Sequence, residues 1–273
     1  MNDWSSNMKK ILLALALMIA GILPQSYAQN TFCGQKNRVV KAGETVNFTV
    51  YYNLSTVWVA AAKASFSTRL ETLDGRPVFH VTGLGNTIKS YDWIFSVKDK
   101  YETYIDTATM LPMKFVRDIN EDGYKLYQYV RFNRAQKKAY TLNNKVFNVP
   151  DCVQDVLSAV YYARNIDYSQ YKPGDKIPFD MFLDDEVYHL YIRYMGKFQI
   201  TTRYGTFNTI KIKPLLVEGT LFKGGEKMEV FVSDDPNHIP VRINSPILVG
   251  SIKVDMMNYS GLKYPLTSLV KKK

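Results

Sequence analysis

The sequence contains few of the residues that carry most enzyme chemistry. It has two cysteines and three histidines among 273 residues. His80, His189 and His238 stand at no spacing typical of a metal site, and neither a His-Glu-x-x-His nor a Gly-x-Ser-x-Gly motif is present. Because no motif is present, the fold alone would have to bring the residues of a hydrolase active site together. Hydrolase activity is therefore the least favoured function. We expect no cofactor and no metal ion.

A long apolar run is also missing beyond the N-terminal end. Two lysines precede an apolar stretch over 11–23, and small residues follow at Ser26 and Ala28, as a signal peptidase requires. We therefore predict a cleaved signal peptide over residues 1–28 and a single exported β domain over 29–273. No later stretch approaches the roughly 20 apolar residues of a transmembrane helix. The expected location is periplasmic or secreted.

Acidic residues are in the minority. The sequence has 35 lysines and arginines against 25 acidic residues, which gives a net charge of +10. The basic residues are spread along the chain, and their only run is 271–273. For an exported chain of this kind we expect no nucleic-acid partner, whereas an anionic lipid or an envelope polymer remains open.

Most of the sequence has the composition of β-strands. The stretch 44–69 is dense in β-branched and aromatic residues, with a break near 53–55 that divides it into two strands. Asp122-Gly123 lies between two further strand-like segments and is a strong hairpin signal.

Only the segment 151–165 has a convincing helical period. Its apolar stripe consists of Val153, Val156, Leu157, Val160 and Tyr161. Asp151 and Gln154 have the spacing of a capping box, and Asn165 is an acceptable left-handed stop. A single stripe needs a single partner surface, so we expect the helix to pack on a sheet.

The cysteines, Cys33 and Cys152, form an isolated pair without a Cys-x-x-Cys motif. In an oxidising compartment such a pair is more often a disulfide than two free thiols. We predict a disulfide that joins the start of the mature chain to the start of the helix. The alternative is a reactive Cys152, whose thiol pKa the first helical turn would lower.

Two segments, 104–115 and 232–243, repeat one pattern: a strand, an acidic turn, and a strand that begins with proline between apolar residues. We predict two similar halves, about 44–149 and 172–260, joined by helix 151–165. The expected fold is all-β with one helix: two antiparallel β-meanders form an open or half-closed barrel around the helix.

Several segments resemble the family of exported bacterial proteins called domain of unknown function 3108. They are Ser90-Tyr91-Asp92-Trp93, the helical run from Asp155 to Arg164, and the strand-turn-strand from Val230 to Ile243. The resemblance spans roughly 45–259 and implies no known activity. The strand-Asp-x-Pro turns are also similar to those of periplasmic lipoprotein carriers, whose half-barrel holds acyl chains under a helical lid. That second similarity is an analogy of fold and carries no function by itself.

Aromatic residues make up 14% of the chain, and ordinary core packing accounts for most of them. A curved sheet closed by one helix can nevertheless leave a concave volume that apolar ligands enter. We therefore predict noncatalytic binding or carriage of an apolar or lipid-like envelope component, lined by Trp58, Phe66, Trp93 and Tyr161. The alternative is an interaction or assembly protein that holds another envelope protein through sheet edges and a basic face.

Overall fold

The computed structural model describes residues 33–54, 57–91, 96–217, 224–247 and 249–273. The predicted signal peptide and Trp93 lie outside these residues. Within them the chain is predominantly β, as predicted. The strands are β1 (Thr45–Leu54), β2 (Val57–Leu73), β3 (Arg76–Thr87), β4 (Lys98–Asp106), β5 (Pro112–Glu121), β6 (Tyr124–Asn133), β7 (Lys138–Thr141), β8 (Val146–Asn148), β9 (Lys176–Leu183), β10 (Glu186–Thr201), β11 (Gly205–Pro214), β12 (Glu229–Ser233), β13 (Pro240–Pro246), β14 (Ser251–Ser260) and β15 (Leu269–Lys272). One α-helix, α2 (Val156–Ala163), and the short 3-10 turns η1 (Lys89–Tyr91), η2 (Leu142–Asn144) and η3 (Tyr168–Gln170) complete the described elements.

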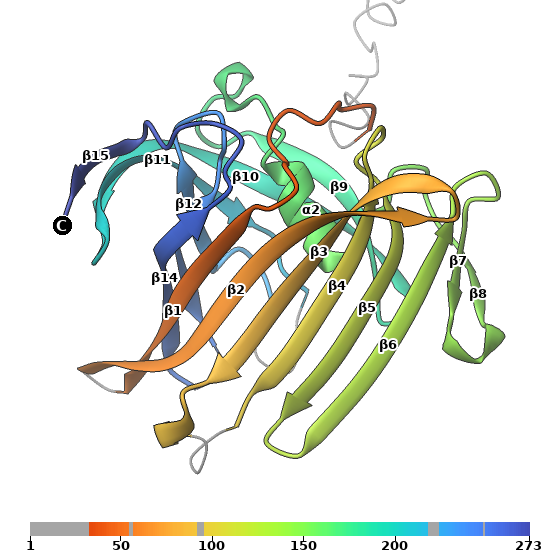
Figure 1. Ribbon diagram of the computed structural model, residues 1–273, viewed down its shortest axis with the longest axis horizontal. Helices are drawn as coiled ribbons and strands as arrows, with labels where there is room; N and C mark the ends of the chain where they lie inside the picture. Colours follow the sequence, from red (N-terminus) through yellow and green to blue (C-terminus); the bar gives the residue numbers. More distant parts are fainter. Residues whose placement is uncertain (1–32, 55–56, 92–95, 218–223, 248) are drawn as a thin grey trace, which may run out of the picture.

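All these strands belong to one antiparallel sheet. Its order is β8-β7-β6-β5-β4-β3-β2-β1-β14-β13-β12-β11-β10-β9, and β15 pairs with β11. Pairing of β1 with β14 joins the early strands to the late ones. The sheet curves so that β1–β6 form a front wall and β9–β12 a back wall, with α2 in the upper part of the space between them (Figure 1). Because no backbone ladder joins β8 to β9 in the described residues, the sheet is large but is not closed into a barrel.

The segment that leads into α2 crosses the gap between the two ends of the sheet. On one side, the backbone N–H of Val149 donates to the carbonyl of Lys137 (3.0 Å). On the other, the N–H of Gln154 donates to the carbonyl of Asp180, and the carbonyl of Gln154 accepts from Phe182, both at 2.9 Å. The segment 149–154 therefore links the two ends in place of a continuous ladder.

Ion pairs add to this link at the tight turn between β9 and β10. Asp184 and Asp185 take left-handed conformations with φ of 51° and 65°, which acidic residues tolerate in a two-residue hairpin turn. Asp184 pairs with Arg117 of β5, and Asp185 pairs with Lys145 before β8 at 3.1 Å. Side chains from the first half of the chain thus form ion pairs with the β9–β10 turn of the second half.

The helix begins later than its sequence pattern predicts. Its N-cap is Asp155, whose side chain accepts from the N–H groups of Leu157 and Ser158, while the Ser158 side chain accepts from the N–H of Asp155. The predicted cap, Asp151, instead pairs with Lys137 at the surface. The prediction was wrong because residues 151–152 form a turn, in which the N–H of Val153 donates to the carbonyl of Pro150 (3.3 Å), and Gln154 pairs with β9, so the helix begins only after these contacts.

The C-terminal end of the helix also differs from the prediction. Asn165 was expected as a left-handed stop, but it is absent from the residues with positive φ. Its side-chain amide donates to the carbonyl of Tyr161 (3.0 Å), and its side-chain oxygen accepts from the N–H of Arg38 (2.6 Å). Side-chain capping and a contact with the N-terminal segment therefore end α2.

Two turns of the predicted repeat share an unusual backbone feature. Met110 before β5 and His238 before β13 both have positive φ, 58° and 45°, and each stands two residues ahead of the proline that opens the strand. Non-glycine residues rarely adopt this conformation. This shared positive φ is consistent with the predicted similarity of the two halves, which stays a prediction.

A disulfide joins Cys33 to Cys152, whose Cα atoms lie 5.4 Å apart and whose positions are 119 residues apart in the sequence. It ties the N-terminal segment to the link that precedes α2. No helix of the described chain has both the length and the apolar composition needed to cross a membrane.

Candidate ligand-binding interior

On β1, β2 and β3, burial decreases along the inner face as the strands run away from α2, whereas on β5 Ile119 remains buried. Alternate residues of a strand share a face, and so do directly paired residues of neighbouring strands. On β1, Val46 and Phe48 are buried whereas Val50, two residues further, is half-buried. On β2, Thr68 beside the helix is buried and Ala64 is half-buried. The core therefore fills the upper interior and leaves the lower inner face in partial contact with solvent.

Two glycines of β3 mark where the filled core ends. A Cβ atom added to Gly83 would lie 2.9 Å from the ring of Phe66 and 3.8 Å from Leu157 of α2, so this level is fully packed. A Cβ added to Gly85, on the same face, would meet no atom of the described residues within 4 Å. Close packing on this face of β3 thus ends within two residues of Gly83.

The lower inner face is apolar on the side where the two halves of the sheet meet. Paired residues of β2, β1, β14, β13 and β12 form this wall. Its half-buried members are Val50, Ala62, Ala64, Val230, Ile243 and Ile252. The members on β2, Ala62 and Ala64, have small side chains and lie beside Val50 and Phe48 of β1.

The same face is polar on β4, β5 and β6. Burial raises the pKa of Tyr101 to about 12, and Arg117, which is paired with Asp184, lies opposite it on β5. Burial also raises the pKa of Asp99, whose carboxylate accepts from the backbone N–H of Asn120 (3.1 Å). This wall combines cationic, phenolic and acidic groups close to the apolar one.

Two buried polar atoms on the polar wall have no hydrogen-bond partner in the described chain: Nε of Arg117 and Oε1 of Gln128. The two residues lie directly opposite each other on β5 and β6. A buried polar atom without a partner is costly, and such atoms are uncommon in folded proteins. Each could be satisfied by a polar group of a bound molecule.

At the packed end of the interior, which contains α2 and is called the closed end below, Asp155 is fully buried next to β4. Its carboxylate accepts from the hydroxyl of Thr103 (2.6 Å) as well as from the helix N–H groups. Burial raises the pKa of Asp155 from 3.8 to about 6, against the hydrogen bonds from Thr103, Ser158 and Leu157, which lower it. A group that binds its proton more tightly in the folded state stabilises most at low pH.

Replacing Asp155 with asparagine should therefore change how stability depends on pH. The contribution of the wild-type carboxyl is fully present below about pH 4 and is lost as the pH rises through about 6, by an amount on the order of 2 to 3 kcal/mol. Asparagine keeps the cap but does not titrate, so the variant should gain stability relative to wild type between these values. Urea unfolding across this pH range measures the difference. Parallel curves for the two proteins would contradict the expectation.

Asp167 offers a control of opposite sign. It is exposed, and hydrogen bonds from Ser169 lower its pKa. The stability gained from a lowered acid pKa is present at neutral pH and is lost as the pH falls. Asp167→Asn should accordingly leave the decline between about pH 4 and 6 unchanged.

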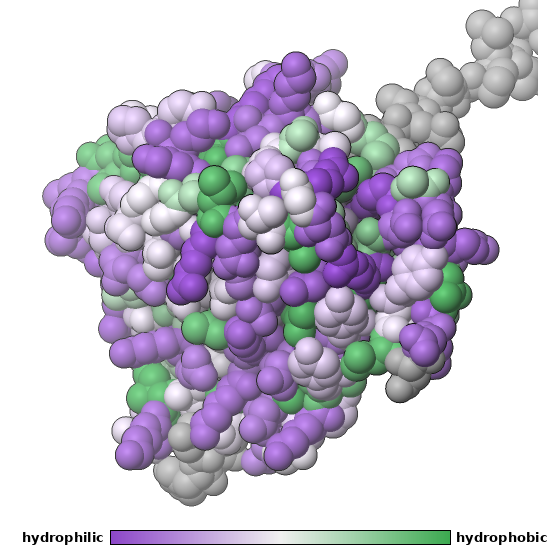
Figure 2. Space-filling model, turned by 45° about the vertical axis from the view of Figure 1, so that its right-hand side comes forward, coloured by the Kyte–Doolittle hydropathy of each residue, from purple (hydrophilic) through white to green (hydrophobic). Residues whose placement is uncertain are grey.

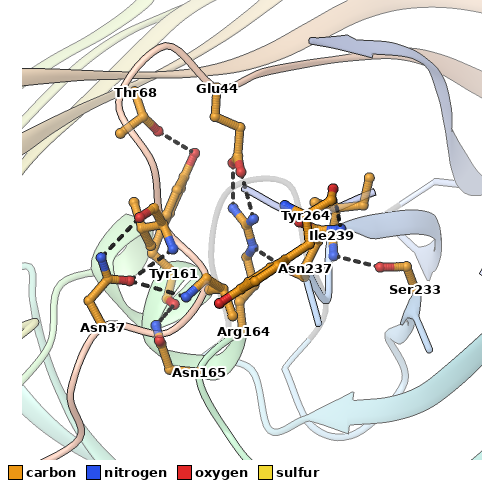
Figure 3. Close-up of polar contacts among 12 residues, drawn as sticks. Asn37, Glu44, Thr68, Tyr161, Arg164, Asn165, Ser233, Asn237, Ile239 and Tyr264 are labelled. Carbon is orange, nitrogen blue, oxygen red and sulfur yellow. Dashed lines mark hydrogen bonds and ion pairs between the residues drawn. The ribbon is translucent and has the colours of Figure 1, made fainter. Parts of the chain in front are cut away.

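A buried ion pair joins distant segments at the C-terminal end of α2 (Figure 3). Arg164 donates to both carboxylate oxygens of Glu44, at 2.6 and 2.8 Å, and its Nε donates to the carbonyl of Asn237 (3.1 Å). Burial lowers the pKa of Arg164, but Glu44 outweighs this and the net shift is upward. One guanidinium thus connects α2, the start of β1 and the turn before β13.

Asn237 extends the network to the C-terminal segment. Its amide donates to the carbonyls of Tyr264 (3.1 Å) and Pro265 (3.3 Å), and its side-chain oxygen accepts from the N–H of Tyr264 (3.0 Å). Asp235 accepts from Ser233 and from the N–H of Ser268. These contacts fix the closed end of the structure rather than offer free reactive groups.

An open hollow of about 480 Å³ lies beside this network. It is lined by Asn37, Arg38, Val39, Arg164, Asn165, Ile166, Asp167, Pro236, His238, Lys263 and Tyr264. The lining is largely polar, and the predicted apolar residues are not part of it.

The histidines do not assemble a catalytic arrangement in the described residues. His238 donates through Nδ1 to the carbonyl of Arg164 (2.8 Å), and burial lowers its pKa. His80 lies between Glu71 (2.8 Å) and Glu102 (3.0 Å) on outer strand positions, and His189 pairs with Asp180. Across the described ranges, no three potential ligand residues gather in a way that could hold a metal ion.

The predicted lining residues fall in different environments. Tyr161 is 2% exposed in α2, and its hydroxyl accepts from Thr68 (3.2 Å). Phe66 packs between the helix and Phe48, at a ring-centroid distance of 5.7 Å, at the top of the open interior. Trp58 is 39% exposed and lies beneath Lys253, away from both. Trp93 lies outside the described residues. The structure therefore brings Phe66 and Tyr161 to one core and separates Trp58 from them.

A register shift explains the position of Trp58. Between Val50 and Tyr51, the pairing with β2 skips Ala61, so Tyr51 faces Ala60. Such a β-bulge turns the following side chains to the other face. The alternation of residues in the sequence cannot reveal this shift. The sequence pattern also gave no reason to single out Gly85 and Ala64.

The fold and the interior define a class of protein: a large open β-sheet, curved around one helix, with a packed closed end and a partly exposed lower face. The sequence matches the family described as "Protein of unknown function (DUF3108)" over residues 47–257. The chain belongs to this family, which confirms the resemblance of its sequence motifs. No curated protein matches the chain.

Three solved bacterial structures match the chain at low sequence identity. A β-barrel-like protein of the domain of unknown function DUF1849 from Brucella abortus has a TM-score of 0.55 at 7% identity, over 83% of this chain and 99% of that one. A proposed lipoprotein from Parabacteroides distasonis ATCC 8503 has a TM-score of 0.35 at 13% identity, over 81% and 96%. A proposed exported protein with a YmcC-like fold from Bacteroides fragilis NCTC 9343 has a TM-score of 0.33 at 10% identity, over 84% and 100%. The first supports the β-barrel-like fold, and the disulfide is consistent with an extracytoplasmic location.

Proposed function

We propose that this protein is a noncatalytic component of the bacterial cell envelope that binds an apolar, acyl-chain-like molecule in the lower interior of its curved sheet. The observation that carries the proposal is the decrease in burial along the inner face, from a packed core at Gly83 to open space at Gly85. Apolar residues that point toward the core side and remain half-buried have unfavourable contact with water, which an apolar ligand would relieve.

The polar wall refines the expected ligand to an amphiphile. An acyl chain would lie against the apolar wall around Val50 and Ile243, with its polar end toward Tyr101 and Arg117. Within the described chain, the Nε–H of Arg117 donates no hydrogen bond and the Oε1 of Gln128 accepts none, so an acceptor and a donor of the ligand could pair with them. Phe66 and Tyr161, which were predicted to line the ligand site, would instead belong to the packed core that borders it.

Native mass spectrometry of protein purified from its exporting host, followed by lipid extraction, tests the proposal directly. A stoichiometric acyl-chain adduct is the expected result. In the same experiment, Gly85→Phe should remove the adduct, and it should weaken binding of a fluorescent fatty acid by on the order of tenfold or more, because the new ring would occupy the open interior.

The adjacent residue gives a matched control. Leu84 is 39% exposed and lies on the opposite face of β3, so Leu84→Phe adds aromatic bulk outside the interior. This variant should bind the fatty acid like wild type. Equal binding by all three proteins, or a protein without any adduct, would exclude the proposed interior site.

The alternative of an assembly protein that acts through sheet edges and a basic face, which an exposed flat aromatic patch would favour, receives less support. On the face visible in Figure 2, hydrophobic residues are scattered among hydrophilic ones and do not form a broad patch. The ends of the sheet at β8 and β9 are linked through residues 149–154 and through ion pairs, which restricts edge-to-edge pairing there.

A further inference from the structure

A second hollow, of about 200 Å³, lies on the face of β1 and β14 opposite the candidate interior. Tyr51 pairs directly with Lys253, whereas the neighbouring pair, Val50 and Val254, points to the core side. The β10–β11 turn contributes Arg203 to the rim. The hollow is therefore separate from the interior proposed above and has a different lining.

Basic residues outnumber acidic ones in this hollow. Arg203, Arg242, Lys253 and Lys273 line it, and Asp255 is the acidic residue in its lining. Arg242 already holds both oxygens of Asp255, at 2.6 and 2.7 Å. In the described part of the chain, no carboxylate lies within ion-pair distance of Arg203 or Lys253. Two positive charges are therefore left without a carboxylate in direct contact.

Aromatic rings hold these two cations in position. The guanidinium carbon of Arg203 lies 4.8 Å from the ring centre of Tyr51, and Nζ of Lys253 lies 4.3 Å from that of Trp58 and 5.8 Å from that of Tyr51. Such contacts stabilise a cation without neutralising it. Tyr51 is only 3% exposed, so the cations cover it and their polar heads border the hollow.

The surroundings of Lys253 favour a bound anion. Partial burial lowers the pKa of Lys253, and repulsion from Arg242 and Arg203 lowers it further, against the attraction of Asp255. An anion in the hollow would offset both the burial and the repulsion. The site is thus arranged to gain free energy from a negative ligand.

We propose that this hollow binds a phosphate-type oxyanion, held by Arg203 and Lys253 above the rings of Tyr51 and Trp58. A guanidinium offers a planar pair of N–H donors that matches phosphate geometry, and an ammonium adds a compact positive charge. A phosphate with a charge near −2 fits two uncompensated cations better than a single carboxylate does. The phosphate belongs to either a small soluble molecule or a lipid headgroup. Trp58 would then contact a ligand, as predicted, but an anionic rather than an apolar one.

Titration calorimetry with inorganic phosphate, and sedimentation with vesicles of phosphatidylglycerol and phosphatidylcholine in equal parts, test this site. Lys253→Met and Arg203→Gln should each weaken binding by on the order of tenfold, since each removes one charge-assisted contact. Binding should also fall with added salt. If these variants lose binding of soluble phosphate, the ligand is a small soluble phosphate. If they lose only the binding to vesicles, the ligand is a lipid headgroup.

Lys211→Met is a matched control for Lys253→Met. Lys211 also lies over aromatic rings, 5.6 Å from Phe198 and 5.4 Å from Phe231, but its ammonium is paired with Glu229 at 2.6 Å. The substitution removes the same charge and should leave binding within about twofold of wild type. An equal loss in both lysine variants would show a nonspecific charge effect and overturn the proposal. So would the absence of binding to both probes. Neither result depends on whether the interior binds an acyl chain.

Discussion

Replacing Glu44 with glutamine is expected to lower the free energy of unfolding by about 3 to 5 kcal/mol, because it leaves the Arg164 guanidinium buried without its counter-charge. Both side chains are almost inaccessible, at 1% and 4% exposure, so water cannot replace the lost partner. The melting temperature should fall by on the order of 10 °C for a chain of this size. Urea unfolding followed by circular dichroism measures the change.

An exposed ion pair provides the control. Lys137 and Asp151 are 2.9 Å apart, with side chains 62% and 59% exposed, and such pairs contribute little. Asp151→Asn should change the unfolding free energy by less than about 0.5 kcal/mol. If Glu44→Gln is equally mild, the network at the end of α2 does not hold the fold. Replacing both Glu44 and Arg164 by methionine should recover part of the loss, since no charge then remains buried.

Removing the disulfide is the second large effect. The Cys33→Ala, Cys152→Ala double variant should lose about 4 to 5 kcal/mol, because the unfolded chain regains the freedom that the bond removes from a long loop. The separation of 119 residues places this bond at the upper end of the expected range. Unfolding midpoints and slopes in urea should be compared, because a more expanded unfolded state also raises the slope.

Reduction separates the role of the bond from that of the substitutions. Wild-type protein in a reducing agent should fall to the stability of the double variant, and the variant itself should not respond to the agent. A loss below about 1 kcal/mol in both would mean that the N-terminal segment is held mainly by other contacts, such as the bond from the N–H of Arg38 to Asn165.

Local patterns predicted much of the fold. The β content, the hairpin at Asp122-Gly123, where φ is 45° and 88°, and the apolar stripe around Leu157 and Tyr161 all depend on neighbouring residues. Family membership also followed from local motifs. The predicted start of the helix was wrong because two acidic residues, Asp151 and Asp155, both suit an N-cap. The choice between them depends on the segment 149–154, which links the two ends of the sheet.

The candidate sites depended on information that a single sequence does not display. Glu44 and Arg164 are 120 residues apart, and no sequence pattern connects the two. The β-bulge at Tyr51 moved Trp58 to the outer face, where it meets Lys253 instead of Phe66. The open interior begins at a glycine, Gly85, whose sequence context resembles that of Gly83. Pairing across the sheet, rather than residue type, determined each of these outcomes.

The pairing of β1 with β14 has a consequence for the order of folding. Thr45 is opposite Ser260, so the first strand gains its second neighbour only when almost the whole chain is available. Contacts between such distant positions slow folding, and a strand that waits for its partner presents an open edge to other chains. A chain that emerges N-terminus first would carry this exposed edge until its last strands arrive. We therefore expect early truncations to aggregate, and a holding chaperone to improve the yield of the complete protein.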